Sequence, residues 1–172
     1  MSDKSRQMTP EEAAEFAEQV FNKARDGDAA MLAALLSKGL PPNLRNHKGD
    51  TLLMLAAYHG HVDAVKVLLE HKADPEVRND NGQSPIAGAA FKGDLDMVKV
   101  LVEGGAEVEG SSFDGRTALM MAAMFNRPAI VDYLISQGAD PKAKDANGIT
   151  ALEAARTMGA TDTTAQLQKL LG

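Results

Sequence analysis

Residues 49–75 read GDTLLMLAAYHGHVDAVKVLLEHKADP, a helix-like apolar pattern that breaks off at Gly60 and starts again at once. Shifting the chain by 33 residues returns the same residue types without an insertion, as the first glycine of the stretch illustrates. This glycine recurs at Gly49, Gly82, Gly115 and Gly148. A fixed period of this size indicates stacked units of supersecondary structure, none of which buries its apolar face alone.

Each unit begins with a helix whose two ends are marked in the sequence. A hydroxyl residue stands where a helix N-cap is wanted, and Pro85 occupies a first helical position, where a missing N–H does no harm. The expected N-caps are Thr51, Ser84, Thr117 and Thr150. The helix should end at a glycine or asparagine, because these residues best tolerate the left-handed conformation. These ends are Gly60, Gly93, Asn126 and Gly159, which explains the break in the opening stretch.

A second helix follows in each unit. In the first full unit its apolar positions are Val65, Leu68 and Leu69, a spacing that gives one buried face. The residues expected to close the second helices are Gly39, Gly105 and Gly138. Asn-Gly and Asp-Gly pairs then supply turn chemistry between units. Each unit therefore reads as helix, turn, helix and hairpin-like loop.

These units resemble the ankyrin repeat family, through GDTLLMLAAYHGHVDAVKVLLEHKADP, GQSPIAGAAFKGDLDMVKVLVEGGAEV and GRTALMMAAMFNRPAIVDYLISQGADP. The resemblance covers residues 45–172, and a degenerate unit precedes them in the same register. It implies an all-α solenoid of about five stacked helix-turn-helix units with hairpin-like loops. The family's Thr-Pro-Leu-His signature is incomplete, since its proline survives only as Pro85. Its histidine position holds Met54, Ala87, Met120 and Glu153.

We expect one domain over residues 1–172, divided by the repeat and closed by a cap at each end. The divisions are an N-terminal capping helix with a degenerate repeat (1–43), three full repeats (44–76, 77–109 and 110–142) and a C-terminal capping repeat (143–172). Thr9, followed by Pro10 and by Glu12, predicts a capped helix that shields the first unit. At the other end Gln168 and Thr164 replace apolar residues, as expected where one face meets water.

The composition is that of a soluble globular protein, with 44% apolar and 24% charged residues. Two Tyr, five Phe and no Trp leave the core to small and aliphatic side chains, which favours packed helices. The absence of cysteine excludes disulfides and a thiol nucleophile. A formal charge of −6 argues against nucleic acid as a partner, because phosphate binding normally needs a basic surface.

The N-terminal sequence gives no sign of export or of membrane insertion. Residues 1–16 mix charges of both signs and lack the apolar core of a secretory signal. No apolar run reaches the length of about 18 residues that suggests a membrane span. We therefore expect a cytoplasmic location and no membrane partner.

Signals of metal binding and catalysis are weak. Of the four histidines, His59 and His61 lie close to Asp63 in sequence, but a helical metal pair needs ligands about one turn apart, and Gly60 ends a helix between them. The sequence has no Gly-x-Ser-x-Gly elbow, no Gly-x-x-x-x-Gly-Lys phosphate loop and no Gly-x-Gly-x-x-Gly fingerprint. We expect no metal, no cofactor and no enzymatic activity.

Ankyrin-like proteins generally bind partners along a concave surface of loop tips and inner helices, and several large residues fall on those columns here. The period needs alanines on the inner helices, but it has no need of bulky side chains just before each glycine. An alternative is that Phe91 or Phe125 packs between units as core. The residues predicted to bind a partner are Arg45, Tyr58, His59, Arg78, Phe91, Lys92, Phe113, Arg116, Met124 and Phe125.

The loop columns also collect charge. Counting Lys48 and Lys144 with the predicted site, six cations stand against three carboxylates, a local excess of three positive charges in an acidic chain. The carboxylates counted are Asp50, Asp80 and Asp114. Together with the rings, this pattern favours a protein partner with an acidic or apolar contact surface over a small substrate.

The leading interpretation is a non-catalytic protein-protein interaction module that acts in the cell as a scaffold or as a stoichiometric inhibitor, and as a monomer. One alternative is an exported effector that binds a foreign protein. A third is a ligand-binding protein or an enzyme with a pocket near Gly88, which interrupts a column that holds Leu55 and Met121 in the neighbouring units. The gap at Gly88 is either a pocket or a place of close helix packing.

Overall fold

The structure is a computed structural model that describes residues 7–172. The first six residues of the expected N-terminal cap lie outside this range. Ten α-helices follow one another in the described chain, with no strand between them. They are α1 (Pro10–Asp26), α2 (Ala29–Ser37), α3 (Leu52–Tyr58), α4 (Val62–Glu70), α5 (Pro85–Lys92), α6 (Leu95–Glu103), α7 (Ala118–Met124), α8 (Pro128–Ser136), α9 (Ala151–Thr157) and α10 (Thr161–Leu171).

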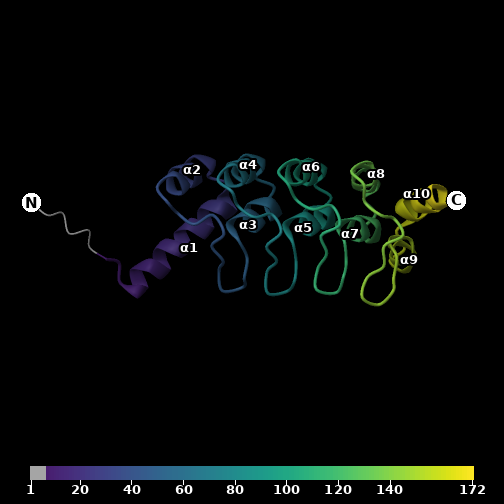
Figure 1. Ribbon diagram of the computed structural model, residues 1–172, viewed down its shortest axis with the longest axis horizontal. Helices are drawn as coiled ribbons and strands as arrows, with labels where there is room; N and C mark the ends of the chain where they lie inside the picture. Colours follow the sequence, from purple (N-terminus) through teal and green to yellow (C-terminus); the bar gives the residue numbers. More distant parts are fainter. Residues whose placement is uncertain (1–6) are drawn as a thin grey trace, which may run out of the picture.

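The helices stack as consecutive pairs into an elongated solenoid (Figure 1). The inner helices are α1, α3, α5, α7 and α9, each of which packs against the next inner helix along the row. The outer helices are α2, α4, α6, α8 and α10, which pack on the inner ones. Hairpin loops project from the side of the inner helices that faces away from α2, α4, α6 and α8 (Figure 1). The predicted all-α solenoid with about five helix pairs is confirmed.

The inner helices begin where the hydroxyl residues predict. The side-chain oxygens of Thr51, Ser84 and Thr117 each accept the backbone N–H three residues later, at 3.1, 3.3 and 3.3 Å. Thr150 does the same at 3.3 Å, and Thr9 forms a reciprocal capping box with its Glu. Each bond satisfies a donor that the first turn of a helix leaves without a partner.

The break in the opening stretch is a left-handed residue. Gly60 has φ 79°, and Asn126 takes the same conformation with φ 60° in the third full repeat. The outer helices end in the same way, as predicted. Their last helical residues include Ser37, Glu103 and Ser136, and the left-handed glycines Gly39, Gly105 and Gly138 each lie two residues beyond. Lys72, with φ 68°, occupies that position in the repeat that lacks the glycine.

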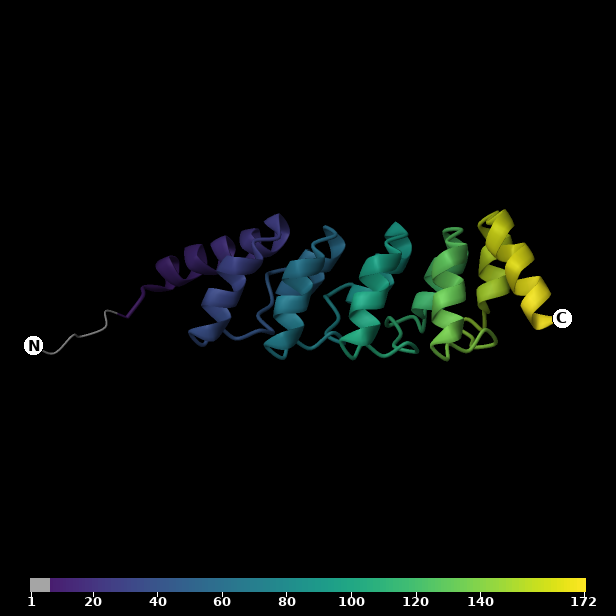
Figure 2. The same cartoon turned by 90° about the horizontal axis from the view of Figure 1, so that it is seen from above.

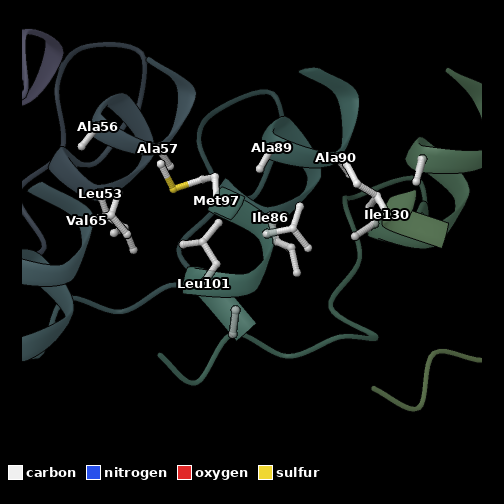
Figure 3. Packing of buried hydrophobic residues seen from close by; sticks show 14 of the residues in the cluster. Leu53, Ala56, Ala57, Val65, Ile86, Ala89, Ala90, Met97, Leu101 and Ile130 are labelled. Atoms are coloured by element: carbon white, nitrogen blue, oxygen red, sulfur yellow. The ribbon is translucent and has the colours of Figure 1, made fainter. Parts of the chain in front are cut away.

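The core is a continuous column of aliphatic and alanine side chains. The recurring leucines and alanines of the period are fully buried. They are Leu68, Leu101, Leu134 and Leu167 on the outer helices, and Ala56, Ala89, Ala122 and Ala155 on the inner ones. Figure 3 shows Met97 of α6 reaching toward Ala57 of α3, and Ile130 of α8 beside Ala90 of α5. Small residues on the inner helices therefore let the repeats approach closely.

The two ends of the stack differ. Helix α1 belongs to the first helix pair and runs outward beyond the rest of the row (Figure 2). Its C-terminal half buries Val20, Phe21 and Ala24, whereas most of its N-terminal half is exposed. At the other end Gln168 is exposed on α10, while Leu167 beside it is buried.

Candidate partner-binding face

The predicted aromatic residues lie on one side of the solenoid, formed by the inner helices and the hairpin loops. We call this side the inner-helix face; its predicted members are the ten residues given above. Tyr58, Phe91 and Phe113 are 47%, 39% and 70% exposed, and Phe125 is half-buried. The rings of Phe91 and Phe125, from successive repeats, meet edge to face with centroids 4.6 Å apart. Neither ring belongs to the buried cluster of the described residues.

Lys92 connects two inner helices. Its amine donates a hydrogen bond to the backbone oxygen of Tyr58 at 2.7 Å and lies 4.1 Å from the centroid of the Tyr58 ring. Arg127 contacts the oxygen of Phe91 in the same way, at 3.2 Å, one repeat further on. The last carbonyls of a helix lack intrahelical partners, so these side chains stabilise the stack as well as shaping its surface.

His59 stands beside Tyr58, with the two rings edge to face and their centroids 5.5 Å apart. Partial burial lowers the pKa of His59, and the positive charge of Lys92 lowers it further. Both effects favour the neutral form of the imidazole. His61 does not line the pocket near Tyr58. Its Nε2 instead forms a hydrogen bond with the backbone oxygen of Arg25, at 2.7 Å.

A pocket of about 490 Å³ opens on the inner-helix face above Gly88. The missing side chain of Gly88 leaves this space between the repeats. Among the described residues that line it are Tyr58, His59, Phe91 and Phe125 from the predicted site, with Met54, Leu55, Ala87 and Met121 beneath them. A Cβ atom added to Gly88 would have one neighbour within 4 Å, Tyr58 Cδ2 at 3.9 Å. The gap at Gly88 is therefore an open pocket and not a close helix contact.

The polar wall of the pocket is organised by Asn79, which the sequence analysis did not single out. Asn79 is only 6% exposed. Its Oδ1 accepts the backbone N–H groups of Asn81 and Gln83, both at 3.0 Å, and its Nδ2 donates to Asp50 Oδ1 at 2.9 Å. The loop column that contains Asn79 was a recognisable signal, because Asn46 makes the equivalent bonds to its own hairpin.

Two of the predicted arginines are engaged within the chain. Arg45 donates to the backbone oxygen of Arg78 at 2.7 Å and lies 3.9 Å from Asp80. Arg116 pairs with Asp114 at 3.5 Å and with Asp145 at 3.9 Å. Asp145 was missing from the sequence-based count, so six cations stand against four carboxylates and the local excess is two.

Phe113 and Met124 lie apart from the pocket. Phe113 packs on Gly82 of the preceding hairpin, where it occupies the place of a Cβ, and the guanidinium of Arg78 lies 5.9 Å from its ring centroid. Met124 is half-buried at the end of α7 and does not line the pocket. The predicted site thus divides into a cluster around the pocket and a separate cluster on the hairpins.

Two further observations bear on chemistry. Residues 7–172 contain no group of three or more His, Asp or Glu side chains placed to hold a metal ion. Over the same residues, no helix is long and apolar enough to cross a lipid bilayer.

Comparison with known proteins identifies the repeat. A family model of three ankyrin repeats matches residues 20–111 and 89–169. The chain belongs to the ankyrin repeat family. This confirms the resemblance found in the sequence. Ankyrin repeats generally mediate protein-protein interaction, and the family is typically not catalytic.

Two curated proteins share part of the ankyrin repeat region. A Pseudomonas aeruginosa protein named as an ankyrin repeat protein is 57% identical over 67 residues, which cover 39% of this chain and 39% of that protein. Human ankyrin repeat domain-containing protein 29 is 44% identical over 55 residues, which cover 31% of this chain and 18% of that protein. The similarity thus spans well under half of either relative.

Proposed function

We propose that this ankyrin repeat protein binds another protein through its inner-helix face and has no catalytic role of its own. The observation that carries the proposal is the group of three rings around the pocket, the exposed Tyr58 and Phe91 and the half-buried Phe125. Rigid aromatic rings in partly desolvated positions are common anchors of protein interfaces. The alanine and leucine columns already supply the core behind them, so folding does not require these rings at the surface.

Such a protein acts by occupying, masking or positioning its partner. We therefore propose a role as a scaffold or as a stoichiometric inhibitor. The two roles separate on one measurement, the partner's own activity in the presence of an equal amount of this chain. A fall in activity that saturates at equal amounts supports an inhibitor, whereas unchanged activity supports a scaffold.

The location of the binding face is tested by hydrogen-deuterium exchange. The immobilised chain captures its partner from a cell extract, and the purified complex is compared with the free chain. We expect slower exchange in α3, α5 and α7 and in the hairpin loops, with unchanged exchange in α4, α6 and α8. Protection confined to the outer helices would contradict the proposal.

Fractionation of untagged protein tests the expected cytoplasmic location against the exported alternative.

A second candidate function, binding of a small ligand, is favoured by the pocket volume alone. A volume of about 490 Å³ lies in the range of roughly 300 to 1,000 Å³ found for small-molecule sites. The polar groups of the wall, however, already bond one another through Asn79. This leaves few groups to fix the orientation of a small polar molecule.

A further inference from the structure

The pocket above Gly88 is an interruption in an otherwise filled column. The residues one period before and after Gly88 are Leu55 and Met121, and both side chains line the pocket. The neighbouring repeats therefore hold a leucine or a methionine at this position, and the repeat with Gly88 lacks such a side chain. Glycine is much less favourable than alanine inside a helix, so the space at Gly88 exists despite a cost to folding.

The chemistry of the pocket walls narrows the kind of group that fits. Its floor is made of Met54, Leu55, Ala87 and Met121, and its rim carries aromatic rings. An apolar side chain gains free energy when it leaves water for such a place. Methionine side chains adapt their shape readily, which suits an incoming group of variable outline.

The charged residues of the pocket indicate which kind of charge lies next to the apolar group of the partner. Lys48 lines the pocket and makes no ion pair or side-chain hydrogen bond with any described residue. Lys92 does not line the pocket itself; its amine lies 4.1 Å from the ring centroid of Tyr58, which does. The one carboxylate of the pocket, Asp50, accepts from the neutral amide of Asn79. Among the described residues that line the pocket, Lys48 is thus the one lysine or arginine, and the single carboxylate is already hydrogen-bonded, on a chain whose net charge is −6.

We propose that this pocket binds one bulky apolar side chain from a linear segment of the partner protein, next to a partner carboxylate that pairs with Lys48. This rests on the proposed function and specifies the partner's chemistry. The apolar side chain fills the place left by Gly88 and contacts the rings of Phe91 and Phe125. The carboxylate meets a lysine that has no other ionic partner, which favours acidic-apolar segments over basic ones.

The proposal is tested with a displayed library of random linear peptides, selected on the wild-type chain. We expect enrichment of sequences that share one fixed large apolar residue with Asp or Glu beside it. Enriched peptides are then titrated against the wild type, Gly88→Leu and Lys48→Ala. Gly88→Leu should weaken binding at least about tenfold because it fills the pocket, and Lys48→Ala should weaken it about threefold, with a smaller salt dependence.

Two controls separate a filled pocket from a damaged fold. Gly88→Ala adds a Cβ with only one neighbour, at 3.9 Å, so it should fold and melt at least as high as the wild type. Ala154→Leu makes the same kind of change in the same column, in the last repeat and away from the pocket. This variant should bind the selected peptides as the wild type does.

The outcomes separate this inference from the function on which it rests. Peptides that bind Gly88→Leu with unchanged affinity but lose binding to the Tyr58→Ala, Phe91→Ala double variant would overturn the pocket and leave the inner-helix face in place. Peptides unaffected by either variant would overturn both. Failure to enrich an apolar-acidic motif would overturn the inference about the partner's chemistry.

Discussion

Asn126 caps a helix of the following repeat: its side-chain oxygen accepts the backbone N–H of Thr163 at 3.1 Å. The same oxygen accepts the N–H of Asp162 at 3.0 Å, and the Asn126 amide donates to the Asp162 carboxylate at 3.1 Å. Helix α10 has Ala160 at its own N-cap and no side-chain cap of its own. A residue that ends one helix thus also begins the outer helix of the next repeat, and it couples α7 to α10.

The coupling predicts the effect of Asn126→Gly. Glycine adopts the positive φ of this position without strain, but it removes the acceptor for both N–H groups. Because asparagine already tolerates this conformation, we expect a net loss of about 1 kcal/mol in the free energy of unfolding. Denaturant titration measures it. An unchanged or higher stability would show that water replaces the cap at no cost.

Lys72 is also a left-handed residue that is not glycine, but unlike Asn126 its side chain caps no helix of the described chain. It holds φ 68° in the column where the other repeats have Gly39, Gly105 and Gly138, and its exposed side chain bonds no described residue. Lys72→Gly should relieve the strain of a left-handed lysine and raise the free energy of unfolding by about 0.5 to 1 kcal/mol. The opposite signs expected for Lys72→Gly and Asn126→Gly distinguish strain from capping. A destabilised Lys72→Gly variant would refute the account of this turn.

The raised pKa of Glu76 predicts that the stability of the fold depends on pH. Burial raises the pKa of its carboxyl, with further increases from the charges of Glu107 and Asp74, while the N–H of Glu107, which donates to Glu76 Oε1 at 2.6 Å, opposes them. A carboxyl whose folded pKa is raised binds its proton more tightly in the folded chain. Its contribution to stability is therefore greatest at low pH and is lost as the pH rises through the folded pKa.

Glu76→Gln keeps an acceptor and removes the charge. We expect this variant to be more stable than the wild type at neutral pH, by less than about 1 kcal/mol because the half-exposed side chain is screened. The difference should shrink as the pH falls toward the acidic range. Glu76→Ala is the control, since it removes the charge and also leaves the Glu107 N–H without its acceptor. If glutamine and alanine destabilise the chain alike at neutral pH, the charge is not what opposes folding. Thermal melts at several pH values decide between these results.

Much of the fold could be predicted because the repeat is local. Thr51 caps its helix with a bond that spans three residues, and Gly60 ends that helix by its own backbone conformation, so the period reveals both. The loop charges behave differently. Arg116 pairs with Asp145 of the next hairpin, a contact that depends on how closely two loops stack. A sequence-based count of charges therefore overstated the positive excess on the face.

The candidate site was predictable in its columns but not in its shape. The period places Tyr58 and Phe91 at equivalent positions near the ends of inner helices and Phe125 in the adjacent column, and these three rings line one pocket. Phe113 belongs to a loop column and packs on Gly82 instead. Whether Gly88 opens a pocket depends on the spacing of neighbouring inner helices, which the sequence alone does not specify. The use of the rings and of the pocket in binding stays a prediction.

The central claim is that the rings on the inner-helix face serve binding and not folding. The direct test compares the Tyr58→Ala, Phe91→Ala double variant with Tyr133→Ala, which removes an outer-helix ring that also has a lysine over it, Lys99 at 5.7 Å. Both variants are measured for their free energy of unfolding and for their affinity for the captured partner.

We predict that the double variant unfolds within about 1 kcal/mol of the wild type, because the buried alanine and leucine columns stay intact. Its affinity for the partner should fall by at least about thirtyfold, the equivalent of about 2 kcal/mol. Tyr133→Ala should bind as the wild type does. A double variant that unfolds would show that the rings are part of the core, and a folded double variant with undiminished affinity would contradict the inner-helix face as the binding site.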